Sequence, residues 1–440
     1  MFGTSGIRGR FGTDVTTELA GSVGKALVAD GAEEVVLGRD PRDSGRPLAD
    51  ALAAGVTAAG GDVIDVGLAA TPTVARSVGW QEADAGVSIT ASHNPAPDNG
   101  IKLWTPSGQA YDETARERIA GLVREASFPT PRHDEIGRRR RWDGATERHA
   151  QAIADAVEQP SDPPAVIIDV GNGSGGVTAA ALRHLGCQVE TLNADPDGSF
   201  PARPSEPTKA NCESLRSVVA ATDADLGVAH DGDADRLLAV DETGAFVSGD
   251  TLLALFSRWA VSDGRAVAVP VDTSLSVAEV VEAAGGSVRH TRVGDVFVAE
   301  VATDPQVAFG GEPSGAWIWP TETLCPDGPF AACVLASRLG EESLSELTAT
   351  IPSFPIRRES IETGQKAAVV AEVGSQLQTR YDDVTTLDGY RVDVEDAWGL
   401  VRASGTQPLV RITAEGTTEA ACAELFDSLS ALVREATESQ

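Results

Sequence analysis

The sequence is short of positive charge, and of lysine above all. Among its 440 residues, 35 basic residues stand against 66 acidic ones, which gives a formal net charge of −31. An excess of this size repels nucleic acids and acidic membranes, so we expect neither as a partner. It also opposes compaction unless counterions screen it. The composition therefore indicates adaptation to a salt-rich cytoplasm, a halophilic trait, with a merely acidic protein as the alternative; the only lysines are Lys25, Lys102, Lys209 and Lys366.

Paired cysteines and long apolar runs are missing as well. An odd number of scattered cysteines without a metal-type spacing predicts reduced, mostly buried thiols. No apolar run is long enough to span a bilayer, and the opening residues do not follow the pattern of a signal peptide. We therefore expect a cytoplasmic protein without a membrane partner. We also expect either a monomer or a homodimer. The cysteines are Cys187, Cys212, Cys325, Cys333 and Cys422.

Short β-branched runs alternate with helical stretches rich in Ala, Glu and Arg, which predicts an α/β architecture with largely parallel strands. Three segments share one outline, in which a buried strand is followed by a polar loop and a helix, and a later strand ends in an unusually polar loop. We expect three related α/β domains with mixed or parallel sheets and a smaller C-terminal α+β domain. Pro-rich and polar stretches divide the chain into residues 1–150, 151–250, 251–353 and 354–440.

The unusually polar loops are the places where chemistry is expected. Residues 87–90 form a strand that leads to Ser92, residues 226–229 lead to Asp231, and residues 307–309 lead to Glu312. Carboxyl ends of parallel strands are where open α/β sheets hold ligands. The three loops therefore predict corresponding functional positions in three repeated units.

One loop carries aspartates at alternate positions, Asp231, Asp233 and Asp235. Hard divalent cations prefer such oxygen ligands, and three carboxylates would repel one another without a cation. The pattern favours a magnesium site, with a solvated acidic turn as the plain alternative. A calcium-binding EF-hand is a weaker rival. Glu242 stands at its twelfth position, but Arg236 replaces the glycine at the sixth and the flanks are typical of strands.

The loop at residues 90–95 places Ser92 at the end of a strand, where a tight turn can expose its hydroxyl group. The adjacent imidazole of His93 and the nearby ammonium group of Lys102 are able to move protons or to stabilise a phosphate. Ser, His and Asn are also common turn residues, so this loop alone is weak evidence for a catalytic serine and fits an ordinary turn better.

Two Gly-rich basic loops suit phosphate. Residues 3–9 combine glycines, hydroxyl groups and Arg8, and residues 402–406 do the same with Arg402, while Arg411 follows on the next strand. Backbone N–H groups and hydroxyls can cradle phosphate oxygens, and arginine adds a charged fork. A single loop of this kind is usually only a turn, but two of them are more telling in a chain with few cations.

Two further segments need an interpretation. The loop at residues 310–315 offers the Glu312 carboxylate and the Ser314 hydroxyl, which suit the hydroxyl groups of a sugar; an ordinary Gly-Pro turn is the alternative. The neighbouring Trp317 and Trp319 are expected in the core rather than at a sugar site. The basic run at residues 138–141 is interpreted as a solvated edge of the first unit, because a nucleic-acid patch does not suit so acidic a chain.

Taken together and in this order, the loops resemble those of the α-D-phosphohexomutase superfamily, which contains phosphoglucosamine mutases, phosphomannomutases and phosphoglucomutases. The resemblance spans nearly the whole chain and includes short archaeal-type members. It implies four domains around a central cleft, the fourth serving as a phosphate-binding cap. It also implies an isomerase that interconverts hexose 6-phosphate and hexose 1-phosphate, with hexose 1,6-bisphosphate as intermediate and activator and a phosphosugar as its partner.

The resemblance assigns roles to individual residues. Ser92 is implied to carry the phosphoryl group as phosphoserine. Mg²⁺ is implied to be held by Ser92, Asp231, Asp233 and Asp235. Proton transfer and charge stabilisation are implied for Arg8, His93 and Lys102. Substrate contacts are implied for Arg236, Glu312, Ser314, Arg402, Ser404, Gly405, Thr406 and Arg411.

The chain departs from the superfamily pattern at a few positions. Ala316 stands where the sugar loop often has His, and Ala403 and Gln407 replace the Pro and Glu common in the phosphate loop. We expect a working phosphate loop of altered detail. Residues 291–295 resemble a loop involved in substrate choice. Glucosamine phosphate is the preferred substrate, with mannose or glucose phosphate as the alternative and a non-catalytic phosphosugar-binding relative as the rival of another class.

Overall fold

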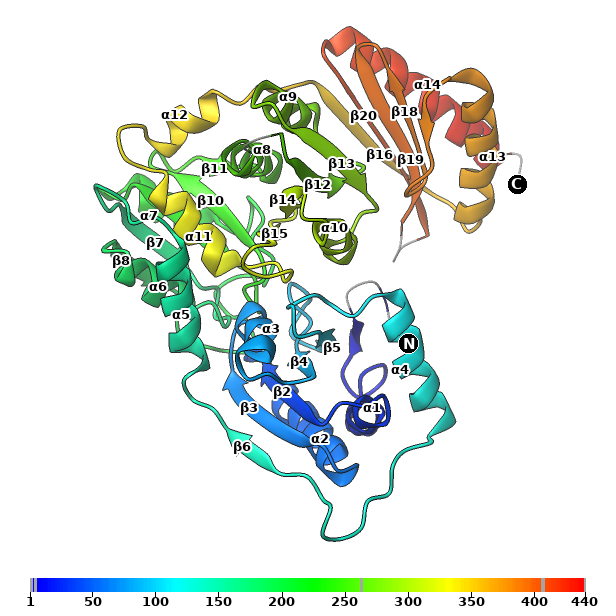
Figure 1. The fold of residues 1–440 in the computed structure, drawn as a ribbon. Helices are drawn as coiled ribbons and strands as arrows, with labels where there is room; N and C mark the ends of the chain where they lie inside the picture. The colour runs from blue at the N-terminus through cyan, green and yellow to red at the C-terminus, as the bar shows by residue number, and fades with distance from the viewer. Residues whose placement is uncertain (1–2, 4–5, 262–263, 405–407, 439–440) are drawn as a thin grey trace.

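The computed structural model describes residues 3, 6–261, 264–404 and 408–438 of the chain. Within these residues four β-sheets follow one another along the chain, and each forms the centre of one unit (Figure 1). We call them units I to IV. None of the helices in the described part of the chain is long and apolar enough to cross a membrane. The five cysteines are free and buried, as predicted.

Unit I is built on a six-stranded mixed sheet. Its elements are β1 (Ile7–Arg10), α1 (Thr17–Ala29), β2 (Glu34–Arg39), α2 (Gly45–Ala58), β3 (Asp62–Leu68), α3 (Thr71–Trp80), β4 (Ala85–Ile89), β5 (Asp98–Trp104), α4 (Glu113–Glu125) and β6 (Arg139–Arg141). The strand order is β1-β5-β4-β2-β3-β6, and only β5 runs antiparallel to the other strands. Alternation along β2 sends Leu37 toward α1 and α2 and Val36 toward α3.

Unit II has a five-stranded sheet in the order β11-β10-β9-β7-β8. Helices α5 and α6 pack against each other beside this sheet. Its elements are α5 (Ala145–Ala156), β7 (Ala165–Asp169), α6 (Val177–His184), β8 (Gln188–Leu192), α7 (Glu213–Ala220), β9 (Leu226–His230), β10 (Leu237–Asp241) and β11 (Phe246–Val247).

Unit III has a four-stranded sheet in the order β13-β12-β14-β15. Trp317 and the ring of Phe256 lie in its core, as predicted for the tryptophan. Its elements are α8 (Gly249–Ala260), β12 (Ala266–Pro270), α9 (Leu275–Ala283), β13 (Ser287–Thr291), α10 (Asp295–Ala302), β14 (Val307–Gly311), β15 (Trp317–Ile318), α11 (Gly328–Ser337) and α12 (Leu344–Ala349).

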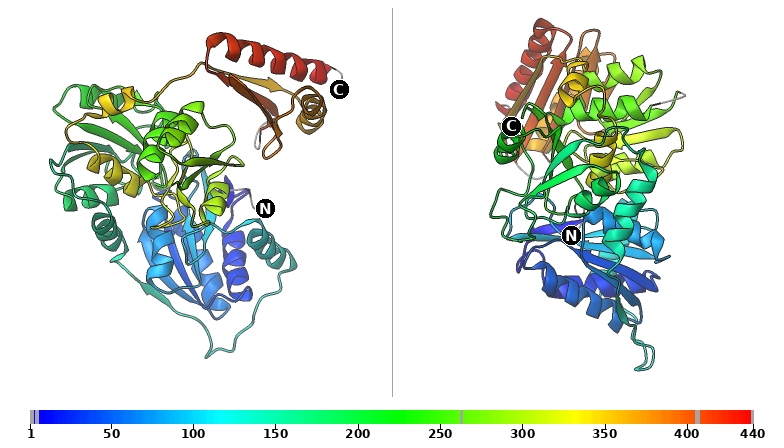
Figure 2. Two further views of the ribbon diagram at one scale, coloured as in Figure 1. Left: turned by 45° about the horizontal axis from the view of Figure 1, so that its top comes forward. Right: turned by 90° about the vertical axis from the view of Figure 1, so that its left-hand side faces the viewer.

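Unit IV is a fully antiparallel sheet in the order β16-β20-β19-β18-β17. Two helices cover one of its faces, and the unit stands at one end of the molecule (Figure 2). From the other face Trp398 and Leu400 pack against Val271 of unit III. Its elements are β16 (Ile356–Glu362), α13 (Lys366–Arg380), β17 (Val384–Thr385), β18 (Tyr390–Val394), β19 (Ala397–Ala403), β20 (Leu409–Gly416) and α14 (Glu419–Glu438).

Units I to III share one four-stranded core. Its strand order is β3-β2-β4-β5 in unit I, β8-β7-β9-β10 in unit II and β13-β12-β14-β15 in unit III. In each core the first three strands are parallel and the fourth is antiparallel. The predicted fold class, three related α/β units and a smaller C-terminal unit, is therefore confirmed. The domain boundaries stay a prediction; two of them, after residues 150 and 250, fall within α5 and α8.

A buried polar cluster joins units I, II and III. Asp327, which caps α11 through the N–H group of Phe330, accepts a hydrogen bond from Arg76 Nε of α3 at 2.8 Å. The same carboxylate oxygen lies 3.0 Å from His149 Nε2 of α5, whose Nδ1 lies 2.8 Å from Thr73 Oγ1. Since polar networks of this kind are stable only when their members stay paired, the cluster fixes the three units relative to one another.

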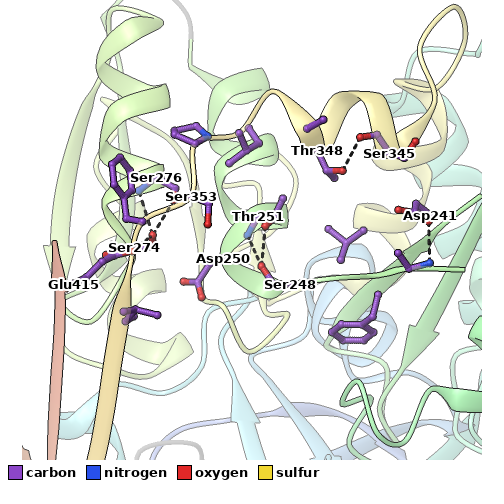
Figure 3. A pocket seen from close by; sticks show the side chains of 18 residues that line it. Asp241, Ser248, Asp250, Thr251, Ser274, Ser276, Ser345, Thr348, Ser353 and Glu415 are labelled. Atoms are coloured by element: carbon purple, nitrogen blue, oxygen red, sulfur yellow. Dashed lines mark hydrogen bonds between the residues drawn. The ribbon is translucent and has the colours of Figure 1, made fainter. Parts of the chain in front are cut away.

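Units III and IV are joined through Glu415 of β20. Its carboxylate accepts hydrogen bonds from Ser274 Oγ at 2.6 Å, from the backbone N–H of Leu275 at 2.7 Å and from Trp398 Nε1 at 2.8 Å. Glu415 thus sits at the start of α9, where the helix dipole favours negative charge. Beside it, a cavity of about 520 Å³ lies under the connection to unit IV, where Asp250 and Ser353 also face inward (Figure 3).

Candidate active site

Ser92 lies in the loop between β4 and β5, in a strained backbone conformation. Its φ is 53°, in the left-handed region that side chains other than glycine rarely adopt. The backbone N–H of Ser92 donates to Thr90 Oγ1 at 2.8 Å, which supports the turn. The conformation directs the buried hydroxyl toward the aspartate loop, where Oγ donates to Asp231 Oδ2 at 2.5 Å and lies 3.5 Å from Asp235 Oδ1.

Arg42 supports the Ser92 loop, although no sequence pattern indicated a role for it. Its side chain is fully buried and pairs with Asp40 at 2.9 Å. The other nitrogens of its guanidinium group donate at 2.6–3.0 Å to the carbonyl oxygens of Ser92, Asn94, Pro95 and Asp98. One buried cation therefore donates hydrogen bonds to four carbonyl groups of a tight loop.

A second buried arginine supports the aspartate loop in a similar way. Arg203 donates from Nε to Asp169 Oδ2 at 2.6 Å and from Nη2 to the carbonyl of His230 at 2.7 Å. Ser205 Oγ then joins the two loops, since it donates to the carbonyl of Ser92 and accepts from the N–H of Gly232, each at 2.9 Å. The sequence pointed to neither arginine; it showed only their aspartate partners, Asp40 directly after β2 and Asp169 at the end of β7.

The aspartates of the loop between β9 and β10 are gathered and buried. Asp231, Asp233 and Asp235 are no more than 4% exposed, and one ligand atom from each lies within 4.8 Å of the others. This burial excludes the solvated turn. Two further observations disfavour the EF-hand. Strands, not helices, flank the loop, and Glu242 accepts a hydrogen bond from the N–H of Ser345 at 3.2 Å.

Neighbouring side chains partly neutralise the three carboxylates. Lys102 of β5 donates from Nζ to Asp233 Oδ2 at 2.9 Å and also to Asp235. Thr71, the first residue of α3, donates from Oγ1 to the same Asp233 oxygen at 2.6 Å. Burial would lower the pKa of Lys102, but the two carboxylates outweigh it and raise that pKa above its ordinary value. The lysine is therefore a fixed cation in this site.

The carboxyl pKa values reflect this uneven neutralisation. Burial and the neighbouring carboxylates raise the pKa of Asp231 well above its usual range and raise that of Asp235 as well. Burial acts in the same direction on Asp233, but Lys102 and the hydroxyl of Thr71 outweigh it, so the Asp233 pKa lies below its ordinary value. The cluster holds more negative charge than its own cation balances.

The donor set fits a hard divalent cation. The atom Asp233 Oδ1 is buried and has no hydrogen-bond partner among the described residues. Carboxylate oxygens are the ligands that Mg²⁺ prefers, and a cation there would satisfy the orphan oxygen and offset the mutual repulsion of the carboxylates.

Two more of the predicted residues lie near Ser92. His93 Nδ1 is 3.4 Å from Ser92 Oγ, and burial together with nearby Arg236, Arg8 and Lys102 lowers the pKa of His93 to about 3. Arg8 is on β1, opposite Gly100 of β5, and its Nε is buried without a hydrogen-bond partner in the described chain. The structure thus brings the predicted residues Arg8, His93 and Lys102 around the serine and the aspartates.

The predicted sugar loop lies between β14 and β15. Glu312 is 7% exposed and accepts hydrogen bonds from the N–H of Gly294 at 2.7 Å and from Ser314 Oγ at 3.2 Å. Burial and the nearby Asp295, which outweigh the attraction of Arg236, raise the pKa of Glu312 to about 7. The loop at residues 291–295 and the Glu312 loop therefore meet, as two parts of one binding surface would.

The predicted phosphate loop connects β19 and β20 in unit IV. Arg402 and Arg411 are directly opposite each other on these strands, so both side chains lie on one face of the sheet. Arg402 lies 3.6 Å from Asp272 of unit III, and Lys366 Nζ donates to the carbonyl of the buried Ser404 at 2.5 Å. Lys366 was not predicted; the predicted Gly405 and Thr406, and the departure at Gln407, lie outside the described residues.

The whole length of the chain resembles known proteins. Residues 1–130, 147–244 and 248–354 match the α/β/α domains I, II and III of phosphoglucomutase/phosphomannomutase, and residues 357–432 match its C-terminal domain. A probable phosphoglucosamine mutase of Methanopyrus kandleri is 45% identical over 99% of this chain and 98% of its own length.

Solved structures agree with the sequence comparison. A phosphoglucomutase/phosphomannomutase family protein of Burkholderia thailandensis superposes with a TM-score of 0.87 at 28% identity, over 99% of this chain and 98% of its own. A putative phosphomannomutase of Thermus thermophilus gives 0.79 at 25% identity, over 100% and 99%. The chain belongs to the phosphoglucomutase/phosphomannomutase family.

Proposed function

We propose that the chain is a phosphohexomutase that interconverts hexose 6-phosphate and hexose 1-phosphate, and that glucosamine phosphate is its preferred substrate. The observation that carries the proposal is the placement of Ser92, whose hydroxyl lies 2.5 Å from Asp231 in a strained loop that the buried Arg42 and Ser205 support. Family membership and the full-length relatives support the same reaction class.

The proposed reaction is a relay through Ser92. Phosphoserine donates its phosphoryl group to the free hydroxyl of the hexose monophosphate, and the serine oxygen is left as the leaving group. The resulting hexose 1,6-bisphosphate turns over in the site and returns the other phosphoryl group to Ser92. In the first transfer a sugar O–P bond forms, the serine O–P bond breaks, and the proton lost by the sugar hydroxyl is matched by the proton that the serine oxygen takes up. The second transfer reverses these changes at the other sugar position.

We assign the metal site to Asp231, Asp233 and Asp235, with an oxygen of phosphorylated Ser92 as a further ligand. A bound Mg²⁺ supplies electrostatic stabilisation of the negative charge on the transferring phosphoryl group. The protein's own cations Lys102 and Arg8 add to that stabilisation, and His93 Nδ1 lies 3.4 Å from the Ser92 oxygen.

Substrate binding is assigned to two loops. Glu312 and Ser314 present oxygen atoms for sugar hydroxyl groups, and Arg236 lies close enough to the Glu312 carboxylate to offset part of the rise in its pKa. Arg402, Ser404 and Arg411, with Gly405 and Thr406, are assigned to the phosphate that does not react. The proposal that glucosamine phosphate is the preferred substrate rests on two relatives. They come from Methanopyrus kandleri and Methanococcoides burtonii, and both are named as probable phosphoglucosamine mutases.

The reaction is tested with Ser92→Ala, and with Ser107→Ala as the matched control. Ser107 is exposed, and its hydroxyl bonds only the hydroxyl of Thr105, at 2.9 Å, among the residues described. In concentrated KCl with Mg²⁺, we expect the Ser92 variant to lose turnover and covalent phosphate labelling, while the Ser107 variant keeps both. Parent-like turnover in Ser92→Ala would end the relay proposal.

The sugar is tested separately, with glucosamine, glucose and mannose 1-phosphates compared on the parent protein. We expect the largest kcat/KM for glucosamine 1-phosphate. A larger value for either other sugar would replace the substrate and leave the reaction class in place. The cytoplasmic location and the monomeric or dimeric state stay predictions.

A further inference from the structure

A cavity of about 360 Å³ lies in unit I, and none of the candidate active-site residues lines it. It is bounded by the ends of β2 and β3, by the first turns of α2 and by the edge strand β6, at the lower left of Figure 1. Its position at the carboxyl end of parallel strands is where open α/β sheets hold ligands. Four of the ten residues that line it are arginines, in a chain whose net charge is −31: Arg39, Arg46, Arg139 and Arg141.

Two of these arginines come from the basic run at residues 138–141, and strand geometry directs them. Because successive side chains of a strand point to opposite faces, Arg139 and Arg141 turn to the cavity and Arg140 turns away. Arg140 accordingly bonds Gln81 at 2.9 Å and lies 3.3 Å from Glu34, outside the cavity. The interpretation of the basic run as a solvated edge was therefore incomplete, because two of its arginines line a cavity and one lies outside it.

A β-bulge makes room for Arg141. The pairing of β2 and β3 shifts by one residue after Leu37, and Gly67 adopts a φ of +73°. A Cβ atom at Gly67 would lie 2.3 Å from Nη1 and from Nη2 of Arg141, so the guanidinium group rests directly on the glycine backbone. Only glycine allows this approach, and bulges commonly re-aim side chains next to functional sites.

The cations of the cavity outnumber its anions. Asp50 and Asp65 are the two acidic residues of the lining, and both pair with Arg139 at 2.8 Å. Arg141 pairs at 2.7 Å with Asp143, which lies outside the lining and is 82% exposed, and approaches Asp65 only to 3.7 Å. Charge within the lining is therefore not balanced.

Two of the four guanidinium groups keep free donors toward the cavity. Arg46 makes no hydrogen bond or ion pair with the residues that the structure describes, and Arg39 uses one nitrogen, which donates to the carbonyl of Asp40 at 3.0 Å. Both lie beside the first turn of α2, whose dipole favours negative charge. Arginine forks aimed at one space are the usual recognition device for phosphate oxygens.

We propose that this cavity is a second anion site, which binds a small phosphate-bearing anion through Arg39, Arg46 and Arg141. Its volume suits a ligand of the size of pyrophosphate or a small phosphomonoester. Arg139 also lines the cavity, but its charge is already neutralised by two carboxylates. The site is separate from the one proposed for the transferred phosphoryl group, so its occupation does not depend on the mutase reaction.

Inorganic pyrophosphate is the probe, titrated calorimetrically into the protein in KCl with EDTA, so that no magnesium complex forms. Arg46→Gln removes an exposed arginine of the cavity. Arg338→Gln removes an exposed arginine elsewhere, at the C-terminal end of α11, whose side chain has no hydrogen bond or ion pair with the described residues. We expect Arg46→Gln to weaken binding about tenfold or more, as the loss of a charge-assisted hydrogen bond does. Arg338→Gln should bind as the parent does.

Any binding at the candidate active site is common to all three proteins, so the difference between them reports the cavity alone. Equal affinities in the parent and in Arg46→Gln would overturn the proposal, as would an absence of pyrophosphate binding in the parent. Crystals of the parent soaked in pyrophosphate give an independent measurement. Density between Arg46 and Arg141 supports the site, and density confined to the Ser92 region overturns it.

Discussion

Arg42 donates a 2.9 Å hydrogen bond to the carbonyl oxygen of Ser92, the residue whose hydroxyl bonds Asp231 from the other side. The serine is thus fixed between a buried cation and the aspartate loop. Because Asp40 pairs with Arg42 and both are 1% exposed, removing either one leaves an unpaired charge in the interior.

Arg42→Ala should lower the free energy of unfolding by about 3–5 kcal/mol, the usual result of breaking a buried ion pair from one side. The double variant Asp40→Asn/Arg42→Ala should lose less than the sum of the two single variants, because neither charge is then stranded. Denaturant unfolding in concentrated KCl measures all three. The exposed Arg46→Ala serves as control, and an equal loss there would contradict the assigned role of Arg42.

Magnesium should stabilise the folded chain. A cation that binds only the folded state adds about 2.7 kcal/mol at a hundredfold excess over its Kd, so the melting temperature should rise with Mg²⁺ and fall with EDTA. Asp233→Asn should abolish most of this response, since it removes the buried carboxylate with the orphan oxygen. Asp143→Asn, at an 82% exposed position, is the control and should respond like the parent. An unchanged melting temperature in both media would argue against the metal site.

Glu312 should make stability depend on pH with an unusual sign. The fold raises the pKa of this carboxyl from its ordinary 4.5 to about 7, so between these values the folded state holds more protons than the unfolded state. The free energy of unfolding therefore falls as the pH rises through this window. Glu312→Gln removes the effect, and the stability of the variant relative to the parent should increase by up to about 3 kcal/mol from pH 4.5 to pH 8.

The Glu312 measurement needs constant salt, because the whole chain is strongly acidic. Taking the difference between variant and parent at each pH cancels the contributions of the other titrating groups. Glu341→Gln, a substitution at an exposed position, is the matched control and is measured at the same pH values. A flat difference for Glu312→Gln as well would show that this carboxyl titrates normally.

Glu415 should hold unit IV against unit III. Glu415→Ala leaves Trp398 Nε1 and the N–H of Leu275 without their shared acceptor, at a cost of about 1–3 kcal/mol for each buried group left unsatisfied. We expect faster proteolysis within residues 350–355 and a larger radius of gyration by small-angle scattering. Glu419→Ala, which removes a 69% exposed partner of Arg357, should leave both unchanged. Parent-like cleavage of the Glu415 variant would assign the interface to its apolar contacts.

The sequence allowed the three chemistry loops to be found because each follows a buried strand of recognisable pattern. A short apolar run such as residues 226–230 is typical of an interior strand, and the polar residues that follow such a strand lie at its carboxyl end. Their mutual approach was implied only by the resemblance to a family, yet Ser92 and Asp231 do meet across 139 positions of sequence. Local periodicity identifies loops; it contains no information on which loops touch.

Arg42 and Arg203 were missed for a different physical reason. Their main partners are backbone carbonyls, and backbone atoms leave no trace in residue identity. Arg402 was predicted, but its partner was not. The approach of Arg402 to Asp272 depends on how unit IV packs on unit III, which the sequence does not show. The cavity of unit I required a bulge at Gly67 that no spacing rule predicts.

The shared core of units I to III has a consequence for how the molecule can be divided. Each unit contributes one loop at the same topological position, before its antiparallel strand, and no unit contains more than a third of the candidate chemistry. A fragment that folds well by itself would therefore be inert. Separately expressed halves would regain function only by reassociating, which makes the chain a natural case for fragment complementation.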